Sequence, residues 1–143
     1  MELVVGLRRR LLYAEDSEQA TKMPLSVTTR KCEPDVTVIE IGGRLALDHE
    51  SGQIEAAMLK ALDEGARRIV IDLSGVSYID STGVGMLTYC FNKISQQNGR
   101  LAVSGAHGFA LKVFRIVQID SMIPFYPDLA SACAALITDG TSA

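Results

Sequence analysis

The sequence has few of the residues on which most catalytic and metal sites depend. It contains no tryptophan, three cysteines without C-x-x-C spacing, and two histidines, His49 and His107. Three cysteines in this arrangement exclude a disulfide framework and a thiolate zinc site. The histidines fall in different predicted connections, so neither is expected to complete a Ser-His-Asp triad. We therefore predict no metal site.

Long apolar runs and an excess of charge of one sign are also absent. No run approaches the roughly 18–20 apolar residues of a membrane span. The first ten residues, MELVVGLRRR, place apolar residues before charged ones, the reverse of a secretory signal. A net charge of −3 gives no electrostatic basis for binding nucleic acid or anionic membrane. These features predict a cytoplasmic protein.

What is present is the composition of one globular domain. Hydrophobic residues form 48% of the 143-residue chain and charged residues 22%. Residues 1–22 differ from the rest because they are charged and lack a sustained hydrophobic period. We predict that they form an N-terminal extension, disordered or arising from an upstream start codon, and that residues 23–143 form the domain.

Hydrophobic periodicity predicts strands alternating with helices. The two opening strands, separated by a turn at Glu33-Pro34-Asp35, suggest an antiparallel hairpin. The later strands need right-handed crossovers, which make the sheet mainly parallel with the hairpin at its edge. The predicted fold class is α/β, with a mixed sheet of about five strands and about four helices. The strands are expected at 25–33, 35–43, 67–75, 100–106 and 122–127, and the helices at 52–65, 84–99, 109–117 and 128–137.

Motifs of phosphate-binding and hydrolytic enzymes are missing as well. There is no Walker A loop, no G-x-G-x-x-G and no G-x-S-x-G elbow. The glycines of SGAHG, residues 104–108, favour an ordinary strand-to-helix turn over an anion nest. An enzyme acting alone is not predicted. The aromatic residues are expected in the core rather than in a stacking row for single-stranded nucleic acid, namely Tyr78, Tyr89, Phe91, Phe109, Phe114, Phe125 and Tyr126.

One stretch stands out, SYIDSTGVGML at residues 77–87. A strand runs directly into a helix there, at the carboxyl end of a central strand, where open α/β sheets place their ligand sites. Asp80, Ser81 and Thr82 are all favoured N-caps because their oxygens accept hydrogen bonds from the first helical N–H groups. Capping alone needs only one of the three.

Two glycines follow these polar residues, Gly83 and Gly85. Each lowers helix propensity by about 1 kcal/mol relative to alanine, which suggests that another molecule approaches closely. A protruding Ser81 in such a turn could accept a phosphoryl group, whose charge the helix N-terminus tolerates.

Residues 25–138 resemble the STAS domain, specifically the bacterial anti-sigma-factor antagonists. In that family an anti-sigma factor serine kinase phosphorylates the serine after the aspartate. The resemblance therefore implies phosphorylation of Ser81, with Thr82 as second candidate, and removal of the phosphate by a serine phosphatase. It implies no cofactor of the chain's own, because ATP and Mg²⁺ belong to the kinase. The implied partner-binding residues are Asp80, Ser81, Thr82, Gly83, Val84, Gly85 and Asp48.

The sequence departs from the family after the second strand, where an aspartate close to the phosphorylated serine is usual. It reads Gly43-Arg44-Leu45-Ala46, and Asp48 is the next acid at a different spacing. This leaves a second hypothesis, a STAS scaffold or an accessory subunit of a lipid transporter that is not phosphorylated. A third is a receiver-type domain with Asp80 as phosphoacceptor, but Lys112 falls inside a predicted helix rather than at a strand end.

Overall fold

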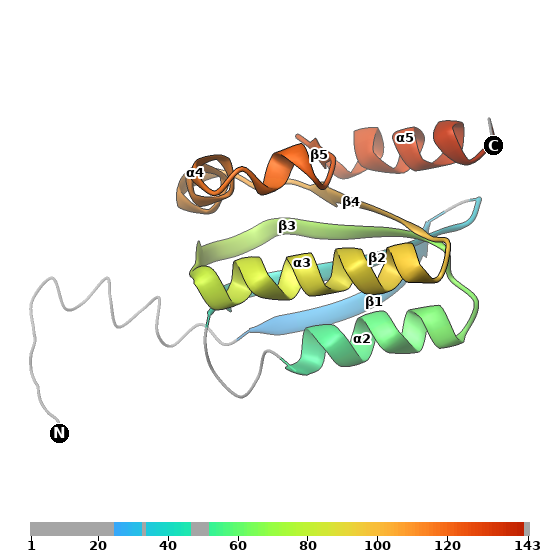
Figure 1. Ribbon diagram of the computed structural model, residues 1–143, viewed down its shortest axis with the longest axis horizontal. Coiled ribbons are helices and arrows are strands. Elements are labelled where there is room, and N and C mark those ends of the chain that lie inside the picture. The colour runs from blue at the N-terminus through green and yellow to red at the C-terminus, as the bar shows by residue number, and fades with distance from the viewer. Residues whose placement is uncertain (1–24, 33, 47–51, 142–143) are drawn as a thin grey trace, which may run out of the picture.

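The computed structural model describes residues 25–32, 34–46 and 52–141, with side chains up to residue 137. The predicted extension, and with it the domain boundary near residue 22, lies outside the described residues. Figure 1 shows a sheet with helices on both sides. The elements are β1 (Ser26–Cys32), β2 (Val36–Leu45), α2 (Gly52–Asp63), β3 (Arg68–Ile79), α3 (Ser81–Gln96), β4 (Arg100–Ser104), α4 (Gly108–Ile116), the 3₁₀ helix η2 (Ile119–Ser121), β5 (Phe125–Tyr126) and α5 (Leu129–Thr141).

The five strands form one sheet in the order β1-β2-β3-β4-β5. β1 pairs with β2 in antiparallel register, and the other three pairs are parallel. This confirms the predicted mixed sheet with a hairpin at its edge. β3 lies at the centre, so the turn that follows it stands in the middle of one end of the sheet.

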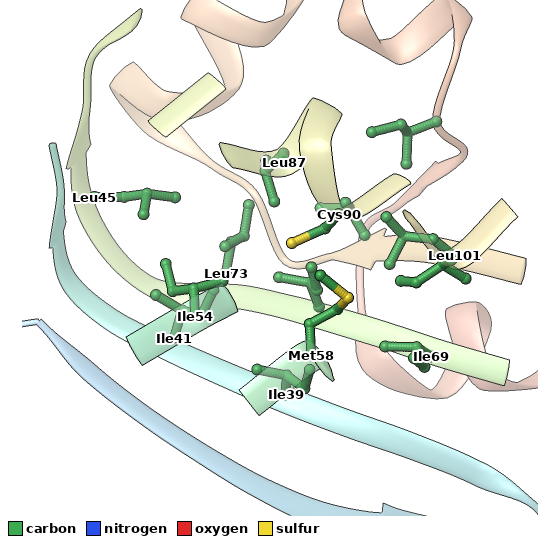
Figure 2. Close-up of a cluster of buried hydrophobic side chains, with 14 of the residues drawn as sticks. Ile39, Ile41, Leu45, Ile54, Met58, Ile69, Leu73, Leu87, Cys90 and Leu101 are labelled. Carbon is green, nitrogen blue, oxygen red and sulfur yellow. The ribbon is translucent and has the colours of Figure 1, made fainter. Parts of the chain in front are cut away.

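The core lies between the sheet and its helices. Figure 2 shows apolar side chains of α2 and α3, such as Met58 and Leu87, above Ile39, Ile69 and Leu73 of the sheet. A smaller cluster on α5, including Leu136, packs with Val36, Val38 and Val70. Alternate residues of the central strands thus face different helices, which explains their nearly unbroken apolar runs.

Helix ends follow the predicted stop signals. Gly65 adopts φ 97°, and the Ala66 N–H donates to the Ala61 carbonyl at 2.9 Å. Asn98 adopts φ 63°, and the Gly99 N–H donates to the Ile94 carbonyl at 2.8 Å. Both are left-handed C-terminal caps, in which the returning N–H satisfies a carbonyl of the last helical turn.

Several boundaries differ from the prediction. β3 runs to Ile79 rather than to residue 75, and β2 runs to Leu45 rather than to residue 43. α3 begins at Ser81 rather than at residue 84, because Asp80 already provides the cap. β5 contains only Phe125 and Tyr126, because Pro124 and Pro127 on either side have no N–H for a strand ladder. η2 was not predicted, since three residues are too few for a periodic signal. None of the described helices is long and apolar enough to cross a membrane.

Candidate functional site

Asp80 joins the end of β3 to the start of α3. Its backbone is extended, with φ −126° and ψ −171°, and its Oδ1 accepts hydrogen bonds from the N–H groups of Thr82 at 2.9 Å and Gly83 at 3.2 Å. The Asp80 N–H donates to the Leu45 carbonyl at 3.3 Å, which holds the turn against the end of β2. Asp80 is therefore the N-cap among the three candidates that the sequence offered.

Ser81 is the first residue of α3 and is exposed. No hydrogen bond from the described part of the chain engages its hydroxyl group. Thr82 is half-buried, so Ser81 presents the more accessible hydroxyl of the two. The helix N-terminus beneath it carries partial positive charge, which favours an anion at this position, while the N–H groups of Thr82 and Gly83 are already bonded to Asp80.

Gly83 is glycine for a reason internal to the protein. It is buried, and a Cβ there would overlap the Leu45 carbonyl oxygen and lie 2.7 Å from Ile79 Cγ1. The interpretation that this glycine admits another molecule is therefore wrong, because the close approach is to β2 and β3. Gly85 is different: it is exposed, and a Cβ there would have no neighbour within 4 Å. Val84 between them is half-buried.

The position of the missing family aspartate is apolar. Ala46 directly follows Leu45, whose register partner is Ile79, so Ala46 lies beside the Asp80–Gly83 turn and is itself buried. Asp48, the alternative acid, lies outside the described residues. Within the described part of the turn, Asp80 supplies the carboxylate.

An aromatic pair lies next to this turn. The rings of Tyr78 and Phe109 stack with centroids 5.6 Å apart and 9° between planes. The Arg44 guanidinium carbon lies 4.1 Å from the centroid of the Tyr78 ring. Phe109 is 53% exposed, so the expectation that it belongs to the core is wrong. The expectation failed because α4 presents apolar residues on two sides, and sequence periodicity reports only the dominant one.

Polar side chains in the turn of residues 104–108 make contacts within the protein. The Ser104 hydroxyl donates to Asp72 Oδ1 at 2.8 Å, and His107 Nε2 lies 2.9 Å from the Ser74 carbonyl oxygen. This agrees with the predicted strand-to-helix turn. The residues that the structure describes contain no group of three metal-ligating side chains.

Buried cysteines fill space rather than offer reactivity. Burial in the core, with a smaller contribution from Glu55, raises the pKa of Cys90 to about 12. Cys133 is also buried, and its pKa is raised to about 11 by burial and by a hydrogen bond with the Cys32 thiol. Both are small residues of the core.

Known proteins share this fold and sequence pattern. Residues 28–132 match the family model of the STAS domain. A protein of Bordetella bronchiseptica, named as a candidate anti-sigma factor antagonist, BtrV, is 30% identical over 86 residues, which are 60% of this chain and 74% of that protein.

Solved structures with the same fold include two antagonists. The crystal structure of an anti-sigma factor antagonist from Mycobacterium paratuberculosis superposes with a TM-score of 0.69 and 24% identity, covering 79% of this chain and 94% of that one. The phosphorylated form of the Bacillus cell fate determinant SpoIIAA gives a TM-score of 0.55 and 24% identity, over 73% and 91% of the two chains.

Proposed function

Because this chain belongs to the STAS domain family, with relatives named as anti-sigma factor antagonists, we propose that it is such an antagonist and is switched by phosphorylation of Ser81. The observation that carries the proposal is the division of roles in the turn. Asp80 caps α3, which leaves the exposed Ser81 hydroxyl available to a partner. The proposal is further supported by SpoIIAA, a protein of the same fold that has a phosphorylated form.

The mechanism is an exchange of partners. The unphosphorylated protein binds the anti-sigma factor, and the sigma factor is released for transcription. The anti-sigma factor is also a serine kinase, which supplies ATP and Mg²⁺ and transfers the γ-phosphoryl group to Ser81. This chain is a ligand and substrate rather than an enzyme, and it needs no cofactor. A serine phosphatase restores the unphosphorylated form.

Electrostatics explain why phosphorylation would change binding more than folding. The phosphate adds a charge of about −1.5 to −2 at pH 7. On the free protein it is exposed to water at a helix N-terminus, which favours anions. In a packed interface beside the Asp80 carboxylate it would lose water and meet like charge. A loss of about 3–4 kcal/mol would weaken binding several-hundred-fold.

The test uses the anti-sigma factor serine kinases encoded in the same genome, each incubated with this protein, ATP and Mg²⁺. Intact-mass measurement is expected to show one added phosphoryl group in the wild type and none in Ser81→Ala. Thr82→Val, the matched neighbour, is expected to be phosphorylated normally. If no kinase of the panel modifies the wild type, the phosphorylation switch is refuted. Modification that persists in Ser81→Ala would move the site to Thr82.

Two further measurements separate the competing functions. A STAS scaffold or lipid-transporter subunit without a phosphorylation cycle predicts that Ser81→Asp leaves partner binding unchanged, whereas the proposed switch predicts clear weakening. Phosphorylation of Asp80 would create an acyl phosphate, which hydroxylamine at neutral pH cleaves. Phosphoserine is a phosphate monoester and survives hydroxylamine, so retention of the label favours Ser81.

A further inference from the structure

Exposed large hydrophobic side chains are concentrated on one segment of the described chain. Of five, one is Leu59 on α2, and the other four lie on α4 and on the residues that follow it. We refer to these four as the α4–η2 surface: Phe109, Ile116, Val117 and Met122, which are 53%, 75%, 51% and 39% exposed. Such clustering is unusual for a surface that meets only water.

The exposure is not needed to hold α4 in place. The inner side of the helix is anchored by Ala110 and Phe114, both buried, and the Phe114 ring contacts that of Phe125 at 5.1 Å. Phe109 and Ile116 are seven residues apart, so they lie on one side of the helix about 10 Å from each other. Both lie on the outer side of the helix, where polar residues would let the protein fold equally well.

The helix end keeps this surface open. Gln118 adopts a left-handed conformation with φ 62°, which is uncommon for a residue other than glycine. α4 ends at Ile116 with Val117 as its C-cap, Gln118 then reverses the chain, and η2 packs against α4. Val117 and Met122 are thereby left on the outside rather than in the core.

The surface is continuous with the Asp80–Gly83 turn, which we call the switch turn. Phe109 stacks on Tyr78, and Tyr78 is only three residues before Ser81 in the chain, a distance of roughly 10 Å at most. A partner large enough to cover the Ser81 turn would therefore also meet Tyr78 and Phe109. Figure 1 agrees, because α4 lies at the end of the sheet where β3 runs into α3.

The charges beside the apolar side chains specify the partner's chemistry. Two basic residues, Lys112 and Arg115, are exposed on α4 and take part in no ion pair within the described residues. One acidic residue, Asp120, is exposed on η2, so basic charge is in excess and lies along α4. A partner surface that complements these side chains is apolar at its centre and acidic at its rim. We infer that the α4–η2 surface is a second docking site for the anti-sigma factor, which binds it through an apolar, acid-flanked patch. This inference rests on the proposed function.

The two sites contribute to binding in different ways. A phosphate on Ser81 changes charge at the turn but leaves the apolar contacts of the α4–η2 surface intact. The Ser81 turn therefore sets the difference between the two phosphorylation states, while the α4–η2 surface sets the affinity common to both. This arrangement lets a kinase hold its substrate during transfer and release it afterwards.

The test measures binding of an ADP-loaded anti-sigma factor serine kinase, taken from those that bind the wild-type protein, by titration calorimetry. Ile116→Ser is expected to weaken binding about 10–100-fold, as truncation of a central apolar contact does. Leu59→Ser is the matched control on α2, and it is expected to stay within about twofold of wild type. Both side chains are exposed, so urea unfolding should show unchanged stability. In the double variant Ser81→Glu/Ile116→Ser, the losses of affinity caused by the two single substitutions are expected to multiply.

Each result has a defined meaning. Equal affinities for Ile116→Ser and Leu59→Ser would overturn the second docking site while leaving the switch in place. Weakening by Ile116→Ser without any phosphorylation of Ser81 would support the docking site and refute the switch. If Ile116→Ser instead abolishes self-association of the protein alone, a second copy occupies the surface, and the inference is wrong.

Discussion

Replacement of Gly83 by alanine tests whether the switch turn is held by the sheet beneath it. A Cβ at this position would overlap the Leu45 carbonyl oxygen and lie 2.7 Å from Ile79 Cγ1 and 2.8 Å from Leu45 Cγ. Neither neighbour can easily move. The Leu45 carbonyl also accepts the Asp80 N–H, and the Ile79 side chain is buried. The first turn of α3 would have to lift off β2.

Two opposing contributions decide the size of the effect. Alanine gains about 1 kcal/mol of helix propensity over glycine. Overpacking against rigid neighbours costs about 1–3 kcal/mol, and loss of the Asp80 cap adds about 1 kcal/mol if the turn shifts. Gly83→Ala should therefore destabilise the protein by about 1–3 kcal/mol. Gly85→Ala has open space around its Cβ, so it should gain up to about 1 kcal/mol.

Urea unfolding followed by circular dichroism measures this difference directly. The two variants should differ by about 1–4 kcal/mol, so with a slope of about 1–3 kcal/mol/M their midpoints should differ by roughly 0.3–4 M. Gly85→Ala serves as the matched control, since it makes the same chemical change two residues further along the same helix. A Gly83→Ala midpoint equal to or above that of Gly85→Ala would refute the close packing of α3 on β2.

Three further predictions concern caps and cysteines. Asp80→Ala should destabilise the protein by about 1 kcal/mol while Asp80→Ser, which restores a cap, should recover most of it in the same urea assay. Hydrogen bonding from Ser131 lowers the pKa of Asp128, so its stabilising effect is present above pH 3.8 and is lost as pH falls through the folded value. The stability difference between wild type and Asp128→Ala should therefore be constant near neutral pH and vanish in acid, and a difference that persists unchanged at the lowest pH would contradict it. A thiol reagent at pH 8 should modify the half-exposed Cys32 of the native protein before Cys90, whose pKa is raised to about 12 by burial.

The sequence allowed the architecture to be predicted because its periodic signals are local and strong. Alternation in β1 and β2, the apolar run 69–71 of β3 and the left-handed stops at Gly65 and Asn98 each depend on a few neighbouring residues. The start of α3 was placed three residues late because the same amino acids occur as capping residues and in the first turn of a helix. Asp80 became identifiable as the cap only from its distances to two backbone N–H groups.

Features that depend on contacts distant in sequence were not predictable in the same way. Gly83 and Gly85 look alike in the sequence, yet one packs against Leu45, 38 positions earlier, and the other faces open space. Phe109 was assigned to the core because apolar residues usually are buried, and only its stacking on Tyr78 shows that it lies at the surface near Ser81. A residue's type therefore indicated where chemistry could occur, but only tertiary contacts separated residues that build the turn from residues that face a partner. In our proposals Ser81 and Phe109 belong to the second group, because both lie at the end of the sheet where β3 runs into α3 and one partner could contact both.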